Sequence, residues 1–223
     1  MHPANRRPAG WLIPALLAVS LAGCGTNAPS HPAPSGGGHA AAVQNGPATD
    51  GAEADRHFPA NQPFQNRLDA LPTTPANVPN AKPADPVLYG ALPVVTPDGR
   101  QETLHPADRP VVFLAYWCPH CQRTLVLWDQ HWSELPVKPV IVATGFQSGT
   151  PLADARRIEE DEIRGLHLQH IQFDAYLLDA DEGKRVIQAY PQAVYELDDQ
   201  LLTLTGERTL DVWKQVFSGT VRG

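Results

Sequence analysis

Ten residues, Ala115 to Thr124 (AYWCPHCQRT), place two cysteines beside a proline, a histidine and a tryptophan. Cysteines separated by two residues could form a redox couple, hold part of a metal site or make a structural disulfide. At the start of a helix they would lie a little under one turn apart, which is close enough to form a Cys118–Cys121 disulfide with little backbone movement. The chemistry therefore depends on the element that follows Cys118.

A cysteine at a helix N-terminus faces unpaired backbone N–H groups and the positive end of the helix dipole, and both favour the thiolate. Cys118 is therefore predicted to be the attacking sulfur. Cys121, one turn into the helix and shielded, is predicted to be the resolving sulfur that releases a mixed disulfide. Pro119 suits the first helical turn. A protonated His120, or one that donates to the sulfur, would stabilise the Cys118 thiolate and make the disulfide a stronger oxidant.

The other two chemistries are weaker alternatives. A structural zinc site takes four ligands, commonly two such cysteine pairs, and this chain has one pair. A disulfide that closes so short a loop constrains the unfolded chain little, so it would add little stability. A copper-binding module remains the alternative function, with Cys118, Cys121 and one histidine of His105, His120, His131, His167 or His170 as ligands. We otherwise expect no metal and no cofactor.

The N-terminal residues predict export from the cytoplasm. Two arginines, an apolar run from Trp11 to Leu21 and small residues ending at Cys24 have the order of a secretory signal peptide over residues 1–23. The run is too short to cross a bilayer as a permanent helix. Leu21-Ala22-Gly23-Cys24 resembles the bacterial lipobox, in which the cysteine is lipidated, and two or three acyl chains anchor a protein stably. The prediction is a lipoprotein on the extracytoplasmic face of a bacterial cell membrane; the alternative is an ordinary signal peptide.

Cysteine usage and charge agree with this location. The chain has three cysteines, and after Cys24 a single pair remains, which favours a working couple over a framework of disulfides. The net charge is -7, and loss of Arg6 and Arg7 with the signal peptide leaves 15 basic against 24 acidic residues, or -9. The sequence has no basic patch of the kind that binds nucleic acid or an anionic lipid surface, so neither is expected as a partner.

Residues 24–85 are rich in Pro, Ala, Gly and Ser and have few large apolar side chains, so they are predicted to form a flexible, lipid-anchored tether. His31, His39 and His57 are scattered in this stretch and are interpreted as linker residues rather than a metal-binding tract. The aromatic-containing part, residues 57–71, is the portion that could dock on a domain.

Residues 86–223 have the length of one compact domain. A hairpin is expected over residues 87–104, with Pro97 and Gly99 in the turn. The continuous apolar runs PVVFLAY (residues 110–116) and VIVAT (residues 140–144) predict strands buried on both faces. Helices are predicted over residues 118–135 and 150–166, the second with Thr150 as N-cap and Gly165 as C-cap.

The remaining pattern predicts a strand within residues 171–178, a short helical or irregular piece at residues 179–185, strands at residues 193–197 and 200–206, and a closing helix at residues 208–217. This β-α-β-α-β then β-β-α order implies an α/β domain with a central mixed sheet flanked by helices, which is the thioredoxin fold, with an N-terminal β-hairpin extension.

From Leu88 to Phe217 the chain resembles the thioredoxin superfamily, and in particular the membrane-anchored, extracytoplasmic TlpA-like thiol-disulfide oxidoreductases. Trp117-Cys118-Pro119-His120-Cys121, at the junction of strand and helix, carries the resemblance. In IQAYPQAVYEL, Pro191 matches the family's cis proline, so the resemblance implies a cis Tyr190–Pro191 bond that brings the backbone of Tyr190 beside Cys118, where an extended substrate could pair with it. The implied partners are protein thiols and disulfides, apocytochrome c among them, and a membrane electron donor or acceptor.

Two features depart from the family. The residue before the cis proline is usually small or β-branched, and here it is Tyr190. Many thioredoxins carry a buried acid on the strand before the motif, and here Val112 stands nearest, so the group that accepts the proton of Cys121 is left open. CPHC is also the motif of strongly oxidising periplasmic disulfide donors, whereas the resemblance to TlpA-like proteins favours a reductant. Whether the protein reduces or oxidises its substrate therefore stays open as well.

Other residues are interpreted as structural. Trp128, Trp132 and Trp213 are expected to pack in the core or between helices, and RRIEEDEIR (residues 156–164) is expected to be a solvated helix face. Asp179, Asp181 and Glu182 lack the spacing of a calcium loop and are interpreted as loop charges.

Overall fold

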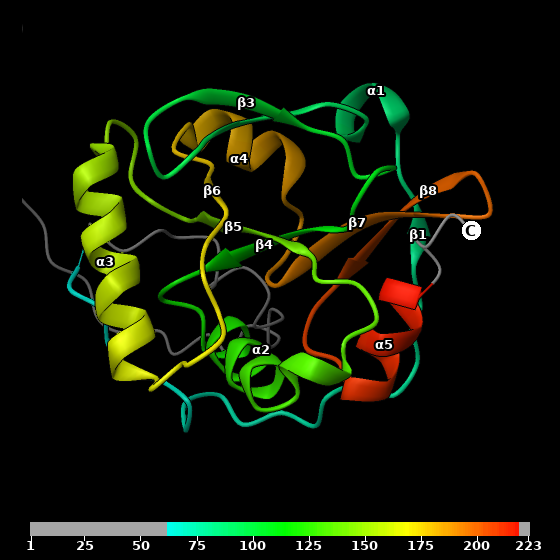
Figure 1. The fold of residues 1–223 in the computed structure, drawn as a ribbon, viewed down its shortest axis with the longest axis horizontal. Coiled ribbons are helices and arrows are strands. Elements are labelled where there is room, and N and C mark those ends of the chain that lie inside the picture. The colour runs from blue at the N-terminus through cyan, green and yellow to red at the C-terminus, as the bar shows by residue number, and fades with distance from the viewer. Residues whose placement is uncertain (1–61, 219–223) are drawn as a thin grey trace, which may run out of the picture. The chain divides into compact units, whose positions relative to one another are not determined.

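The computed structural model describes residues 62–218, all within the compact unit formed by Thr49–Gly223. The predicted signal peptide, the lipobox with Cys24, and the tether histidines lie outside the described residues. An eight-stranded mixed sheet forms the centre of this unit, in the order β1-β8-β7-β4-β5-β6-β2-β3 (Figure 1). Its strands are β1 Lys82–Pro83, β2 Leu92–Val95, β3 Gln101–Leu104, β4 Val111–Ala115, β5 Val140–Thr144, β6 Ala175–Tyr176, β7 Gln192–Leu197 and β8 Gln200–Thr205.

The centre of the sheet is formed by the two apolar runs that the sequence marked as strands. Every residue of β4 and of β5 is buried, and the two strands pair in parallel with Val111 opposite Val140. On its other side β4 pairs antiparallel with β7, and β7 pairs antiparallel with β8. Strands buried on both faces need apolar side chains at successive positions, which explains the lack of polar alternation in these runs.

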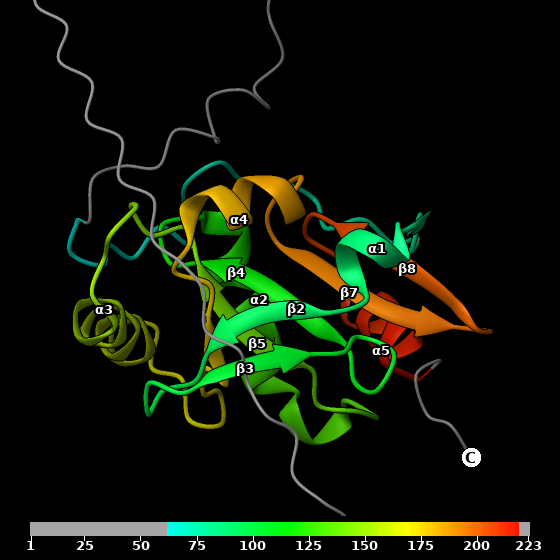
Figure 2. The same ribbon diagram turned by 90° about the horizontal axis from the view of Figure 1, so that it is seen from above.

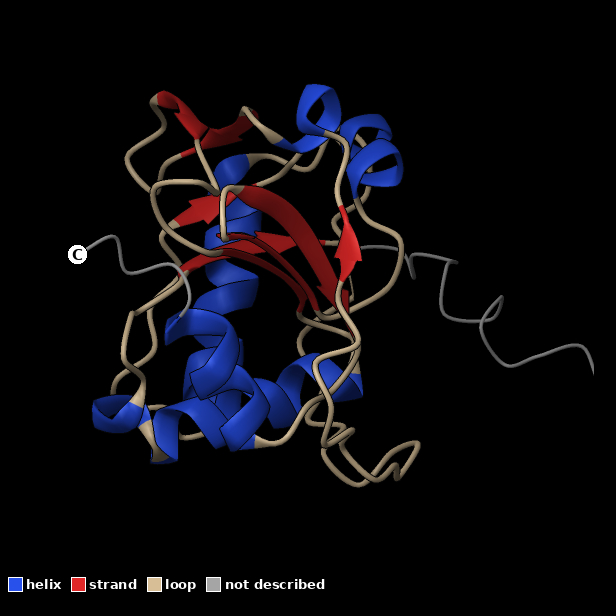
Figure 3. Cartoon of the chain, turned by 90° about the vertical axis from the view of Figure 1, so that its right-hand side faces the viewer, coloured by secondary structure: helices blue, strands red, loops and turns tan. Residues whose placement is uncertain are grey.

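Helices cover both faces of this sheet (Figure 3). The longer helices α2 Pro119–Gln130, α3 Leu152–Gly165 and α5 Leu210–Ser218 contribute residues to one core cluster, which includes Trp128 and Trp213 in edge-to-face contact. A second cluster on the other face includes Tyr89 and Val186, from α1 Pro86–Tyr89 and α4 Ala180–Val186. Figure 2 shows α1 and α4 above the sheet. This topology is a thioredoxin fold, as the sequence predicted.

Several boundaries differ from the prediction. Residues 86–89 form a helical turn rather than hairpin strand, because Asp85 caps the turn by accepting a hydrogen bond from the Val87 N–H and Pro86 occupies its first position. Helix α3 begins one residue later than expected, with Pro151 as N-cap, because the Thr150 hydroxyl donates to the Gln147 carbonyl instead of capping the helix.

The C-terminal end of α3 also differs. Gly165 is the last helical residue and Leu166 is the C-cap. The following turn is held by Asp129 of α2, whose carboxylate accepts hydrogen bonds from the N–H groups of Gln169, His170 and Ile171. The helix itself ends in a local backbone turn, in which the Leu168 N–H donates to the Ile163 carbonyl and His167 has a positive φ, whereas the Asp129 contact comes from another element and is not predicted by local sequence.

Part of the predicted tether lies on the domain. Lys82 and Pro83 form β1, which pairs with β8, and Phe64 and Leu68 pack against the core cluster. Residues 62–76, here called the strap, make hydrogen bonds to α2 that are described with the site. No helix in the described part of the chain is long and apolar enough to span a membrane.

Candidate active site

The junction of β4 and α2 positions the cysteine pair. Cys118 is the N-cap of α2 with extended backbone angles (φ -86°, ψ 118°), and Pro119 is the first helical residue. The Cys118 N–H donates to the Ala115 carbonyl at 3.0 Å, and the Cys118 carbonyl accepts the first helical hydrogen bond from Gln122 at 3.0 Å. Cys118 thus lies at the positive end of a three-turn helix, as the spacing of the motif predicted.

The two sulfurs occupy different surroundings, and both are thiols in this structure. Cys118 lines a cavity, whereas Cys121 is fully buried and its Sγ accepts a hydrogen bond from the Ala115 N–H at 3.4 Å. Burial raises the pKa of the Cys121 thiol well above 9.0, and the hydrogen bond and negative charge of Cys118 raise it further. Cys121 is therefore the sulfur that keeps its proton in the resting site.

Trp117 and Tyr190 form one wall of the site. The Trp117 indole N–H donates to the Gly145 carbonyl at 3.0 Å, and the Tyr190 ring meets the Trp117 ring edge to face at 5.5 Å. The Tyr190–Pro191 bond is cis, as expected. Burial raises the Tyr190 pKa, and charge on either cysteine raises it too, so this phenol stays neutral beside the redox pair.

A cavity of about 740 Å³ opens at this wall. Trp117, Cys118, His120 and Tyr190 line it together with residues 73, 74 and 76, residues 183–185, residues 187–189 and residues 206–208. The structure therefore brings Cys118, the predicted attacking sulfur, and three of the predicted supporting residues to one cavity. Pro119 and Pro191 occupy the helix start and the cis bond beside it.

His120 belongs to a charged cluster that sequence analysis missed. Its Nδ1 lies 2.9 Å from Nη2 of Arg123 and 3.0 Å from Oε2 of Glu207. Arg123 in turn donates from Nε and Nη2 to the Glu207 carboxylate at 2.9–3.0 Å. Burial alone would raise the Glu207 pKa, but the hydrogen bonds from Arg123 and His120 outweigh it and lower that pKa below 4.5.

The contacts of His120 Nδ1 with Arg123 and with Glu207 require different tautomers of the ring. A guanidinium can only donate, so its bond to Nδ1 requires an unprotonated Nδ1 and places the proton of the neutral ring on Nε2. A bond from Nδ1 to Glu207 instead requires a protonated Nδ1. The ring tautomer therefore decides which of the two contacts of Nδ1 is a hydrogen bond.

The strap packs beside the same helix turn. The Arg67 N–H donates to the Gln122 side-chain oxygen at 2.7 Å, and its guanidinium donates to the Trp117 carbonyl at 2.9 Å. Arg123 donates to the carbonyls of Leu68 and Ala70, and Thr73 donates to Glu207. These contacts join residues about 50 to 130 positions apart, so no local sequence pattern predicts them. The aromatic residues before Leu71 indicated only that this stretch could dock on the domain.

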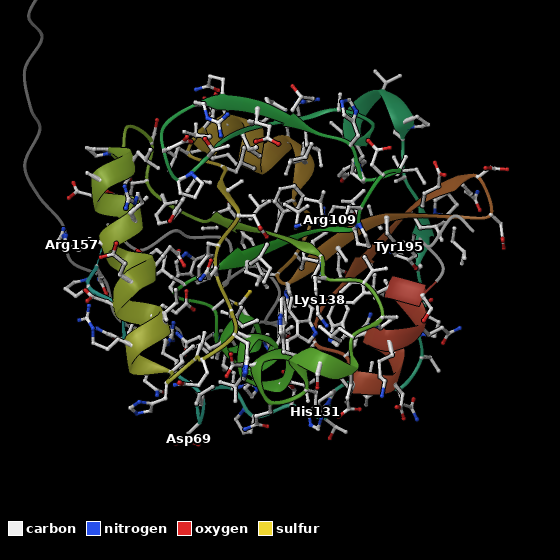
Figure 4. The ribbon with its side chains drawn as sticks, viewed as in Figure 1. Asp69, Arg109, His131, Lys138, Arg157 and Tyr195 are labelled. Atoms are coloured by element: carbon white, nitrogen blue, oxygen red, sulfur yellow. The ribbon has the colours of Figure 1, made fainter. Side chains whose placement is uncertain are left out.

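Two acidic residues of α3 contradict the prediction of a solvated face. Glu159 and Glu162 are each 1% exposed. With Ala155, Ile158 and Leu166 they follow the spacing of one helix face, and that face packs on the core. Arg157 lies on the outer side of the same helix (Figure 4). The helical period was therefore a better guide to burial than the charge of the side chains.

The candidate copper histidines are dispersed. His105 contacts the Gly90 carbonyl, His131 contacts Glu134, and His170 contacts Asp129. His167 has a positive φ of 57° after the end of α3. Among the described residues there is no group of three or more histidine, cysteine, aspartate or glutamate side chains that could hold a metal ion.

Comparison with known proteins finds similarity at the level of structure. No protein-family model and no curated protein sequence matches the chain. The exposed lipoprotein thioredoxin Etrx1 of Streptococcus pneumoniae is 21% identical, with a TM-score of 0.38 over 57% of this chain and 98% of its own. StoA of Bacillus subtilis is 17% identical (TM-score 0.39, 63% and 98%), and a secreted thiol-disulfide isomerase of Corynebacterium glutamicum is 14% identical (TM-score 0.41, 66% and 98%).

Proposed function

We propose that this protein is a thiol-disulfide oxidoreductase that acts on protein cysteines outside the cytoplasm and is held to the membrane by lipid on Cys24. The observation that carries the proposal is the unequal placement of the two sulfurs. Cys118 is at a helix N-terminus on a cavity, and Cys121 is fully buried within hydrogen-bonding contact of it. An attacking sulfur must meet a partner, and a resolving sulfur must meet the attacking one.

In the reductive direction the reaction has two exchanges. The Cys118 thiolate attacks a substrate disulfide, forms a mixed disulfide and expels one substrate sulfur as a thiolate. Cys121 then loses its proton and attacks Sγ of Cys118, which forms the Cys118–Cys121 bond and releases the second substrate sulfur. The substrate gains two electrons and the protein loses them. Oxidation of a dithiol substrate is the same sequence reversed.

Residues around the cavity support this chemistry. The N–H groups at the start of α2 favour the Cys118 thiolate, and a protonated His120 would add to that effect. Tyr190 and Trp117 line the cavity beside Cys118, and the backbone beside the cis bond would offer an edge for an extended chain. Protein disulfides, with apocytochrome c as one candidate, are the substrates, and a membrane electron donor or acceptor would restore the resting state.

The first prediction concerns the cysteines. Cys118→Ser should reduce insulin reduction or dithiol oxidation at least a hundredfold, because no thiol remains at the cavity. Cys121→Ser should accumulate a mixed disulfide between Cys118 and the substrate, because the resolving step is lost. Mass spectrometry under non-reducing conditions would detect the mass of this adduct. An unchanged rate in Cys118→Ser, or tight stoichiometric Cu(I) binding without turnover in the unmodified protein, would contradict the proposal.

The direction is read from one equilibrium measurement. The Cys118/Cys121 couple is equilibrated with glutathione, and the fraction of disulfide is followed by alkylation. A potential close to that of thioredoxin, about -270 mV, indicates a reductant, and one close to about -120 mV indicates a donor of disulfides.

A further inference from the structure

Arg208 is a cationic side chain in the wall of the Cys118 cavity that the exchange reaction itself does not use. It lies between β8 and α5, and it lines the cavity together with Cys118, His120 and Tyr190. Within the described part of the chain its guanidinium makes one hydrogen bond, in which Nη1 donates to the Glu207 carbonyl at 3.1 Å, and it forms no salt bridge. Its Nε–H is buried without an acceptor among the same residues. A guanidinium has five N–H donors, so most of its hydrogen-bonding capacity is unused.

Contacts with the redox site hold residues 206–208 in place. The Gly206 N–H donates to the carbonyl of Pro191, the residue of the cis bond, at 2.7 Å. The side chain of Glu207 lies 3.0 Å from Nδ1 of His120, within the CPHC motif. The segment that carries Arg208 therefore touches both the cis-proline loop and the helix turn of the two cysteines.

The strap holds the same segment from the other side. Ala76 forms a parallel β-bridge with Arg208. The Ala76 N–H donates to the Glu207 carbonyl, and the Thr209 N–H donates to the Ala76 carbonyl, both at 3.1 Å. The backbone of Arg208 is thus fixed before any ligand enters the cavity, which lowers the entropic cost of binding a ligand to its side chain.

The neighbouring carboxylate does not balance the charge of Arg208. Glu207 is the one acidic residue among the described residues that line the cavity, and it accepts hydrogen bonds from Arg123 and from the Thr73 hydroxyl. Burial lowers the pKa of Arg208 below 12.5, because lost hydration disfavours the cation. An arginine nevertheless keeps its proton at neutral pH, so a positive charge without a partner faces the cavity.

Other cations reinforce the sign of this charge. Lys184 and Arg185 also line the cavity, and they pair with Asp181 and Glu182, which do not line it. The Lys184–Asp181 pair is exposed to solvent, and such pairs contribute little and are screened by salt. The cavity beside the attacking sulfur therefore has an excess of positive charge in a chain whose net charge is -7.

We propose that Arg208 binds a side-chain carboxylate of the client, so that the protein selects clients with an aspartate or glutamate within a few residues of the reacting cysteine. The inference rests on the proposed redox function and names a substrate class for it. A guanidinium binds a carboxylate through parallel, charge-assisted hydrogen bonds, which an amide or an amine on the client cannot provide. This contact holds the client chain in the cavity while the Cys118 thiolate attacks its sulfur, and the exchange reaction is otherwise unchanged.

The experiment uses short peptides with acetylated and amidated ends, so that a side chain carries the only carboxylate. Each peptide has one cysteine, joined by a disulfide to 2-thiopyridine, and a glutamate, glutamine or lysine two residues before or after it. Attack by Cys118 on the peptide sulfur releases thiopyridone, whose absorbance times the first exchange whatever the potential of the couple. Each rate is divided by the rate of the same peptide with dithiothreitol, which removes the intrinsic effect of peptide charge.

In the unmodified protein the glutamate peptide should react roughly fivefold or more faster than the glutamine peptide, and the lysine peptide should be the slowest. In Arg208→Gln the three rates should agree to within about twofold, and in Arg208→Glu the lysine peptide should become the fastest. Arg100→Gln is the matched control, because it removes the same charge from an exposed residue that does not line the cavity. This variant should keep the preference for glutamate.

Equal rates for the three peptides in the unmodified protein would overturn the inference, and that result needs no variant that folds. A glutamate preference that persists in folded Arg208→Gln, or that is lost to the same extent in Arg100→Gln, would overturn it as well. If every peptide instead releases thiopyridone no faster with the unmodified protein than with Cys118→Ser, the proposed function itself has failed.

Discussion

His120 stands between the redox pair and a nearly buried ion pair. Its side chain is 19% exposed and that of Glu207 is 9% exposed, so the contacts among His120, Arg123 and Glu207 are poorly screened by solvent. The Arg123 guanidinium also donates to carbonyls of the strap. One arginine therefore fixes the carboxylate, the ring orientation of His120 and the position of residues 68–71.

The pH dependence of stability tests this cluster. Because the folded-state pKa of Glu207 is lower than 4.5, its ionised form contributes stability that is fully present above the unfolded pKa and is lost as pH falls through the folded value. Arg123→Ala leaves Glu207 buried without its cation, so we expect a loss of roughly 2–4 kcal/mol at pH 7. Urea unfolding should show this loss shrinking below about pH 4. A loss that is equal at pH 3 and pH 7 would contradict the assignment.

At the scale of elements, the loop after β5 supports the aromatic wall. Gly145 has a positive φ of 81°, and a Cβ on it would lie 2.8 Å from the Trp117 indole nitrogen and 2.9 Å from the Ala115 Cβ. This backbone position therefore excludes larger residues for two reasons, the left-handed conformation and the close approach of Trp117. The same residue supplies the carbonyl that holds the indole N–H.

Gly145→Ala should therefore disturb both packing and chemistry. We expect a loss of roughly 1–3 kcal/mol in the free energy of unfolding, together with a change in Trp117 fluorescence, because the indole must move away from the added methyl group. Gly149→Ala is the matched control, since Gly149 also has a positive φ (80°) and nothing lies within 4 Å of its Cβ position. An equal fluorescence change in both variants would show that strain rather than contact with Trp117 is responsible.

The elements that sequence predicted well are those whose signals are local. The apolar runs gave β4 and β5, and the cysteine spacing with Pro119 gave the start of α2. Long-range contacts gave no such signal: Arg123 and Glu207 are 84 positions apart. The burial of Glu159 and Glu162 runs against the general preference of charged side chains for the surface, but it agrees with the helical period, which places both residues on the face that packs on the core.

On the scale of the whole molecule, the proposed lipid anchor is Cys24, which lies before the described residues. Cys24→Ser should move the protein from the membrane fraction to the soluble fraction and abolish labelling by a palmitate analogue, because a single substitution removes the acylated sulfur and the processing signal. The redox activity of the domain should not change, since Cys118 and Cys121 are intact. Retention in the membrane fraction would show that another part of the molecule supplies the anchor.

The depth of Cys118 limits which proteins can exchange electrons with it. Only 3% of this residue is exposed, although it borders a cavity. When Cys118 attacks a client disulfide, three sulfurs must lie nearly in line and the client supplies two of them, so we expect the rigid surface of a folded globular partner to reach the buried sulfur poorly. A client would have to present its cysteine on a projecting or unfolded strand. Disulfide exchange would then compete with folding of the substrate protein, and it would occur mainly before that protein has folded.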